Sequence, residues 1–265
     1  MESSESMAAM IEIQGVSKIF SDISQNVTAA VEDISLTIQA GEFVCIVGPS
    51  GCGKTTLLHS IAGLKPYFPP ERGRILIEGR QVKGPGAERG VVFQEYALLP
   101  WRNVQENIEF GLKLRKVAPA ERAKRSEYYI QLIGLQEFRS KFPHQLSGGM
   151  KQRVAVARAL VNNPKVLLMD EPFAAVDAQT RMTLQEELNR IYEQEKNTIL
   201  FVTHSVEEAI FLATRIIVLS ARPGRVMDDL PVRIPRPRRW AEMPRDLEFQ
   251  RLLTYVLSLI RRQGD

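Results

Sequence analysis

The spacing of hydrophobic and polar residues along this chain is typical of strands in some segments and of helices in others, and the two kinds of segment alternate. Apolar runs and period-two alternation predict strands at 11–16, 34–38, 43–47, 74–79, 91–93, 166–169, 198–202 and 216–219. Helical patterns are found at 55–62, 104–114, 119–132, 147–160, 180–195 and 206–214. Strands that alternate with helices indicate a mainly parallel sheet covered by helices, so the sequence predicts an α/β fold.

Residues from about 95 to 160 carry helical patterns only, with strand patterns on both sides. Pro119 is well placed to start a helix there and Gly134 to stop one. We therefore expect a helical subdomain inserted into one α/β domain that spans residues 10–225.

The two ends of the chain differ from this domain. Residues 1–9 are expected to be flexible, and 226–265 to form a basic Pro/Arg linker followed by a helix. An apolar stripe from Phe249 to Ile260 marks that helix. We expect the basic run 233–239 to be a solvated linker; contact with anionic lipid headgroups is the alternative.

Composition narrows the class of protein. The 265 residues are 44% hydrophobic and 25% charged, which is typical of a globular protein. A net charge of +4 is too weak to imply nucleic-acid binding, so we expect no nucleic-acid partner. The first residues are acidic and polar, so we expect no secretory signal there, and no apolar run approaches the roughly 18 to 20 residues of a membrane helix. Cys45 and Cys52 are expected to be reduced thiols in the cytosol, and any membrane role must come through a partner.

A glycine-rich segment follows the apolar run 43–47. It reads Gly48-Pro49-Ser50-Gly51-Cys52-Gly53-Lys54-Thr55 and fits the pattern G-x-x-x-x-G-K followed by Ser or Thr. Its backbone N–H groups are expected to form a nest for phosphate oxygens, next to the positive end of the following helix. Lys54 would reach the β- and γ-phosphates, Thr55 would coordinate Mg²⁺, and Thr56 completes the nucleotide-binding set. A glycine-rich turn without a ligand is the alternative, which the flanking strand and helix disfavour.

Two carboxylates follow the apolar run 166–169. Ligands of open α/β sheets bind at the carboxyl ends of the strands, and Asp170 comes at such an end. We expect Asp170 to hold the Mg²⁺ shell and Glu171 to act as general base toward the attacking water. A helix-start signal is the alternative explanation of this Asp-Glu pair.

A second small-residue segment precedes the helical pattern 147–160. It reads Leu146-Ser147-Gly148-Gly149-Met150-Lys151-Gln152-Arg153. Ser147 is a favoured N-cap, and the glycines leave a helix N-terminus open to an anion. Because the chain already has one phosphate site, this second one suggests a nucleotide held by another copy. A capped helix without a ligand is the alternative.

Together with 48–55, Gln94, Asp170-Glu171 and His204 in this order, the 146–153 segment resembles the ATPase subunits of ATP-binding cassette (ABC) transporters. The resemblance implies a P-loop NTPase (RecA-like) core, an antiparallel β subdomain and the inserted helical subdomain. It also implies a homodimer that sandwiches two MgATP, each phosphate loop facing the partner's Ser147, Gly148 and Gly149.

Further roles rest on this resemblance alone. His204 would contact the γ-phosphate and orient Glu171 and water, whereas a histidine after a strand is otherwise structural. Gln94 would ligate Mg²⁺ or position water, and Asp177 would lie at the dimer interface. Phe20, where many members have Tyr, would stack on adenine; packing in the core is its alternative.

The type of cassette is indicated by two further segments. Gly84 to Trp101 and Arg222-Pro223-Gly224-Arg225 resemble the ATPases of nitrate, sulfonate and taurine importers. This implies integral-membrane permease subunits, an extracytoplasmic solute-binding protein and a peripheral location on the cytoplasmic face of the membrane. Leu98-Leu99-Pro100-Trp101 would form the permease-docking surface, unless Trp101 packs inside the helical lobe. Another importer, an exporter or a soluble cassette ATPase are the alternative functions.

Overall fold

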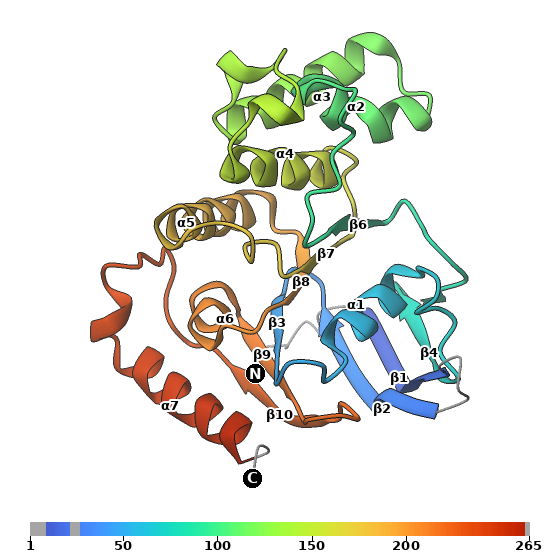
Figure 1. The fold of residues 1–265 in the computed structure, drawn as a ribbon, viewed down its shortest axis with the longest axis vertical. Helices are drawn as coiled ribbons and strands as arrows, with labels where there is room; N and C mark the ends of the chain where they lie inside the picture. Colours follow the sequence, from blue (N-terminus) through green and yellow to red (C-terminus); the bar gives the residue numbers. More distant parts are fainter. Residues whose placement is uncertain (1–8, 22–26, 263–265) are drawn as a thin grey trace, which may run out of the picture. The chain divides into compact units, whose positions relative to one another are not determined.

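The computed structural model describes residues 9–21 and 27–262, which belong to two compact units (Figure 1). Unit 1 comprises Met1–Gly86 and Asn197–Asp265, and unit 2 comprises Ala87–Lys196. The segment that we expect to be flexible lies outside the described residues, apart from Ala9, which starts the first strand. Within the described part of the chain, no helix combines the length and apolar character that a membrane span requires.

Unit 1 contains an antiparallel sheet in the order β2-β1-β4-β5. Its strands are β1 (Ala9–Ser21), β2 (Val27–Gln39), β4 (Arg72–Ile77) and β5 (Arg80–Gln81). Ile13 of β1 lies opposite Leu36 of β2 and Ile75 of β4, so apolar residues face one side together. The predicted antiparallel β subdomain is confirmed. Strands β1 and β2 are longer than the predicted 11–16 and 34–38, because their backbone pairing continues to Ser21 and Val27, beyond the alternating residues.

Unit 1 also contains a parallel set of strands. The fully buried strand β3 (Phe43–Val47) pairs in parallel with β8 (Thr198–Val202) and β9 (Arg215–Leu219). A strand that is buried on both faces needs the continuous apolar run seen here. The helices of this unit are α1 (Lys54–Ala62), α6 (Val206–Leu212), α7 (Leu247–Arg261) and the 3₁₀ turn η3 (Met243–Arg245). Helix α7 packs on α6 of its own unit, as expected of an apolar stripe.

Unit 2 contains two parallel strands, β6 (Arg89–Val92) and β7 (Val166–Asp170). Its helices are α2 (Val104–Leu114), α3 (Pro119–Leu132), η1 (Gln136–Phe138), η2 (Pro143–Gln145), α4 (Gly148–Leu160) and α5 (Ala178–Glu195). The bounds of α2 and α3 match the helical periodicity. Asn103 starts α2 with a capping box, in which its side chain accepts from the Glu106 N–H at 2.8 Å.

The segment after residue 225 is not a linker, and that prediction is wrong. Residues Val226–Pro231 form strand β10, which pairs antiparallel with β9. Arg238, only 5% exposed, donates to the carbonyl oxygens of Ile210, Phe211 and Ala213 at 2.8–2.9 Å. The last carbonyls of helix α6 need donors, and a guanidinium offers five N–H groups in a fixed fork. The predicted solvated run therefore contains a buried cap for α6.

Candidate functional site

The phosphate loop connects β3 to α1 in unit 1. Gly53 is the N-cap of α1 and has φ +95°, a left-handed conformation that favours glycine. A Cβ at Gly53 would lie 2.5 Å from the Ala30 carbonyl oxygen, so the position also requires glycine for space. No side chain caps the first turn of α1. The helix N-terminus is thus shaped as a backbone cradle for an anion.

Lys54 lies inside this loop. Its Nζ donates to the carbonyl oxygens of Gly48 at 3.0 Å and Pro49 at 2.9 Å. Burial raises the pKa of the adjacent Cys52 thiol, and the Lys54 ammonium, 3.9 Å from its sulfur, partly opposes that effect. The nine predicted nucleotide-binding residues thus form the loop after β3 and the start of α1: Gly48, Pro49, Ser50, Gly51, Cys52, Gly53, Lys54, Thr55 and Thr56.

His204 lies at the same edge of the sheet as the phosphate loop. Strands β3 and β8 are parallel neighbours, with Ile46 opposite Val202, so their carboxyl ends meet there. The His204 side chain is exposed. The next residue, Ser205, starts α6 by accepting from the Glu208 N–H at 3.2 Å. A helix start thus follows the histidine directly and fixes the backbone beside it.

Phe20 lies on β1, opposite Thr28 of β2, and is half-buried. Its ring meets the Tyr67 ring edge-to-face at 5.9 Å, and the Lys18 ammonium lies 5.5 Å from its centroid. Phe20 is therefore not part of the apolar core, which was the alternative. The β1–β2 hairpin adjoins the phosphate loop, because Ala30 contacts Gly53.

In unit 2, Gln94 and the two carboxylates lie at one sheet edge. Strands β6 and β7 are parallel, with Val92 opposite Met169. Gln94 lies two residues after the end of β6, Asp170 is the last residue of β7, and Glu171 follows it. Asp170 is buried, Gln94 is exposed, and Glu171 has φ +41°. A left-handed glutamate costs about 1–3 kcal/mol, and such strained residues are found at functional sites as well as at turns. Sequence patterns carry no sign of this strain.

The segment 146–153, called the signature segment from here on, leads into helix α4 (Gly148–Leu160) as predicted. Ser147 Oγ accepts from the Met150 N–H at 3.3 Å, which makes Ser147 the N-cap. A Cβ at Gly148 would lie 3.0 Å from the Tyr96 hydroxyl, and one at Gly149 would lie 2.7 Å from Thr180. Close packing inside unit 2 therefore also favours glycine at both positions.

Asp177 starts helix α5. Its carboxylate accepts from the Thr180 N–H at 3.0 Å. This hydrogen bond lowers the pKa of the Asp177 carboxyl. The side chain is exposed and stays ionised, and in this structure it acts as the N-cap of α5.

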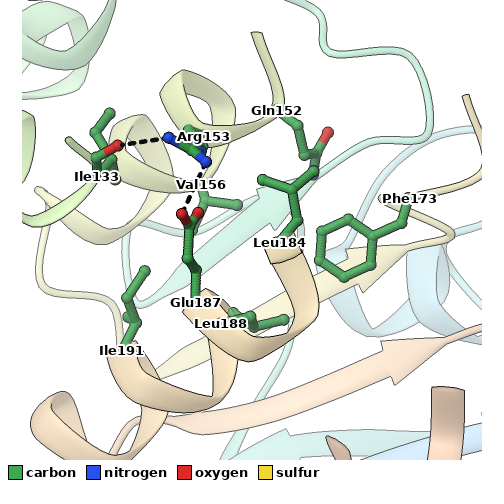
Figure 2. Close-up of a pocket in the computed structure, with 9 residues that line it drawn as sticks. All are labelled: Ile133, Gln152, Arg153, Val156, Phe173, Leu184, Glu187, Leu188 and Ile191. Atoms are coloured by element: carbon green, nitrogen blue, oxygen red, sulfur yellow. Dashed lines mark hydrogen bonds and ion pairs between the residues drawn. The ribbon is translucent and has the colours of Figure 1, made fainter. Parts of the chain in front are cut away.

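The last residues of the signature segment, Gln152 and Arg153, line a pocket between α4 and α5 of unit 2 (Figure 2). Arg153 forms an ion pair with Glu187 at 2.8 Å, and Gln152 lies beside it, fully buried. Burial raises the pKa of Glu187, and Arg153 opposes the shift without cancelling it. None of the predicted catalytic residues lines this pocket. Arg153 therefore fastens α4 to α5 through its ion pair with Glu187, a role that the sequence did not predict.

Trp101 does not pack inside the helical lobe, so that alternative is wrong. Its side chain is 70% exposed, on a turn that precedes α2. The fully buried Asn107 holds this turn, because its side chain accepts from the Leu99 N–H at 2.8 Å and donates to the Arg102 carbonyl at 2.9 Å. Asn107 carries no signal in the sequence, since a polar residue in an amphipathic helix is ordinarily a solvated one.

Known proteins share this arrangement. The family model described as ABC transporter matches residues 31–174. The nitrate import ATP-binding protein NrtD of Synechocystis sp. is 46% identical over 95% of this chain and 95% of its own length. The taurine import ATP-binding protein TauB of Escherichia coli is 45% identical over 89% of this chain and 93% of its own length.

A solved structure extends the likeness to the fold. The ATP-binding cassette MJ0796, determined as a dimer in a post-hydrolysis state bound to ADP and Pi, has a TM-score of 0.73 and 32% identity. The match covers 85% of this chain and all of that one. The chain belongs to the ABC transporter family, as an ATP-binding cassette of P-loop NTPase fold whose ATPase activity is coupled to transport.

Proposed function

We propose that this chain is the ATPase subunit of an importer that takes up a small oxyanion, such as nitrate, an aliphatic sulfonate or taurine, through a separate permease. The observation that carries the ATPase part is the parallel pairing of β3 with β8, which places His204 at the sheet edge where the phosphate loop begins. The solute class rests on the names of the relatives, which are nitrate and taurine import proteins.

Unit 1 would bind the triphosphate. The loop backbone presents N–H groups at the start of α1, where the positive end of the helix dipole favours phosphate. Lys54 Nζ now bonds to two loop carbonyls, and phosphate oxygens are stronger acceptors that would replace them. Phe20 would stack on the adenine ring, since its side chain is half exposed on the β1–β2 pair beside the phosphate loop.

The candidate ligands fit Mg²⁺. The Thr55 hydroxyl, the Gln94 side-chain oxygen and the Asp170 carboxylate are all hard oxygen ligands, which this ion prefers. When bound, the metal would neutralise charge on the β- and γ-phosphates. Asp170 is buried at the end of β7, so its carboxylate would be held rigidly for that task.

Hydrolysis would need a base and a group that senses the γ-phosphate. Glu171 would accept the proton of the attacking water, and its left-handed backbone would fix the direction of its carboxylate. His204 would donate a hydrogen bond to the γ-phosphate and orient the water. The reaction is then an in-line displacement that depends on positioning and charge stabilisation.

Two copies would close around two MgATP. Ser147 is exposed at the start of α4, so Ser147, Gly148 and Gly149 would bind the γ-phosphate held by Lys54 of the partner. Asp177 would lie at the same interface. Loss of the γ-phosphate would remove the bridge and open the dimer. The related MJ0796 cassette was solved as a dimer with ADP and Pi.

The membrane partner would bind the Leu98–Trp101 turn on the cytoplasmic face. An exposed tryptophan on a turn that a buried asparagine holds rigid is the type of anchor that interfaces use. A solute-binding protein on the other side of the membrane would deliver the solute to the permease.

The test is co-purification of the tagged chain from detergent-solubilised membranes, followed by mass spectrometry. We expect a stoichiometric polytopic membrane protein, and uptake assays of that complex with labelled nitrate, taurine and an alkanesulfonate identify the solute. If only soluble proteins or nucleic acid are recovered, the importer proposal is wrong while the ATPase assignment stands.

A further inference from the structure

The turn between β9 and β10 has no part in the function proposed so far. It spans residues 220–225 and contains Arg222-Pro223-Gly224-Arg225, which sequence analysis singled out. Arg222 and Arg225 are exposed, whereas Gly224 is buried. Because Gly224 has no side chain, its burial between two exposed arginines indicates that the backbone of the turn packs closely against a neighbouring segment.

Gly224 packs against the phosphate loop. A Cβ at Gly224 would lie 2.1 Å from the Cys52 carbonyl oxygen, far inside any permitted contact. The φ of Gly224 is outside the range that disfavours side chains, so the demand for glycine comes from space and not from backbone conformation. The turn therefore touches the peptide that precedes Gly53.

Gly224 also pairs with strand β2. Its N–H donates to the Ala30 carbonyl at 2.9 Å, and its own carbonyl accepts from the Glu32 N–H at 2.9 Å. Ala30 in turn is the residue that leaves no room for a Cβ at Gly53. Three backbone segments, from the turn, from β2 and from the phosphate loop, thus pack together without an intervening side chain.

The turn is held in shape from within. Ser220 Oγ accepts from the Arg225 N–H at 2.9 Å and lies 2.9 Å from the Pro223 carbonyl oxygen, to which it donates. Arg225 forms an exposed ion pair with Glu32 of β2 at 2.8 Å. The Ser220 side chain therefore supports the turn from within, beside the backbone hydrogen bond from the Ser220 N–H to the Arg225 carbonyl at 2.9 Å.

We propose that Gly224 is a positioning residue for the nucleotide site. The turn supports the Cys52–Gly53 peptide from behind, and so fixes the direction of the N–H groups that would bind phosphate. A nest binds an anion only when successive N–H groups converge, so a small displacement of this peptide weakens phosphate binding. The inference rests on the proposed use of this loop to bind the triphosphate.

Gly224→Ala tests the inference, because it adds one methyl group directed at the Cys52 carbonyl. Binding of MgATP and of Mg-tripolyphosphate is measured by calorimetry on the full chain. We expect both dissociation constants to rise by the same factor, about tenfold or more, since a displacement on the order of 1 Å in a site has effects of up to about a hundredfold. The matched control is Gly79→Ala, at an exposed glycine with φ +71° and open space around it, which we expect to leave both constants unchanged.

Two results would overturn the inference. One is wild-type affinity for both ligands in Gly224→Ala. The other is weaker binding of ATP with unchanged binding of tripolyphosphate, which would mean that the turn acts on the adenine side through β2. If the wild-type chain binds neither ligand, the proposed triphosphate site itself is wrong, and that outcome is distinct from a failure of Gly224 alone.

A second variant is decisive if Gly224→Ala does not fold. Ser220→Ala removes the side-chain support of the turn and adds no atom. We expect the melting temperature of the nucleotide-free variant to stay within a few degrees of the wild-type value. The dissociation constants of MgATP and Mg-tripolyphosphate should both rise by about three- to tenfold. Unchanged tripolyphosphate binding in a folded Ser220→Ala protein would contradict the proposal.

Discussion

The Trp240 indole stacks on the Phe211 ring, with centroids 4.2 Å apart and ring planes inclined by 15°. Phe211 is fully buried in α6, the helix that begins just after His204. The Trp240 ring also meets Phe249 of α7 at 6.4 Å. The chain beyond residue 225 thus joins the core of unit 1 through aromatic contacts as well as through Arg238.

Trp240→Ala is expected to lower the free energy of unfolding by about 2–3 kcal/mol, because the indole is half-buried against two rings. Urea denaturation measures the change. Leu247→Ala is the control, since Leu247 is 80% exposed and its loss should change stability by less than about 0.5 kcal/mol. Equal effects of the two variants would show that the stack adds no stability.

Glu171→Gln should keep MgATP binding and nearly abolish turnover, with kcat lower by about a hundredfold or more, because the amide cannot accept the proton of water. The ATP-bound dimer should then persist, as detected by size-exclusion chromatography with light scattering. The exposed Glu137→Gln in η1 is the control and should hydrolyse ATP normally. Normal hydrolysis by Glu171→Gln would show that another group is the base.

His204→Ala should lower kcat by about a hundredfold, since one hydrogen bond to the developing charge is lost. We expect the dissociation constant for ATP to change by less than about threefold, because the phosphate loop supplies most of the binding. Phosphate release and equilibrium binding are measured on the same preparation. Glu207→Gln, on the next exposed position of the α6 start, should change neither quantity.

Trp101→Ala should leave the free energy of unfolding within about 0.5 kcal/mol of the wild-type value, since the side chain is 70% exposed. ATP affinity should be unchanged, while co-purification with the permease should decrease. A protein that is destabilised but still binds its membrane partner would contradict the docking role. Leu114→Ala, at another exposed apolar position of unit 2, controls for a general loss of surface hydrophobicity.

Glu187 should make stability fall as pH rises. Its pKa is raised by burial in the native state, so the native protein keeps a proton that the unfolded chain, with a pKa of about 4.3, has already released. Between about pH 4.3 and the raised pKa, unfolding therefore releases a proton. Each pH unit within that window favours the unfolded state by at most about 1.4 kcal/mol.

Glu187→Gln isolates this effect, because other carboxylates titrate equally in both proteins. Urea denaturation from pH 4 to pH 8 gives the difference in unfolding free energy between wild type and variant. We expect wild type to lose stability relative to the variant as pH rises through that window. A wild type that instead gains stability relative to the variant would mean that the ion pair with Arg153 outweighs burial.

Sequence patterns predict the local features of this fold well. The strands at 43–47 and 198–202 and the helices at 104–114 and 119–132 have the predicted bounds, since their apolar spacing is continuous and their ends carry clear signals. Ser147 is predictable as an N-cap because capping depends on only a few neighbouring residues.

Contacts between distant residues are not predictable in this way. The proline-arginine run predicts a solvated Arg238, because it carries no apolar period and three of the carbonyls that accept from Arg238 lie in or directly after α6. The contact of Gly224 with Cys52 joins two backbones, and no side-chain pattern records it. The left-handed backbone of Glu171 is likewise not predictable, because glutamate ordinarily avoids this conformation.

The buried guanidinium of Arg238 also bears on where this chain could be divided or joined to another protein. A cassette joined to a new partner at residue 225 would carry α6 without the donors for its last carbonyls. Because α7 packs on α6 as well, a junction within 226–261 would cut into the fold of unit 1, whereas one after Arg261 would leave these contacts in place.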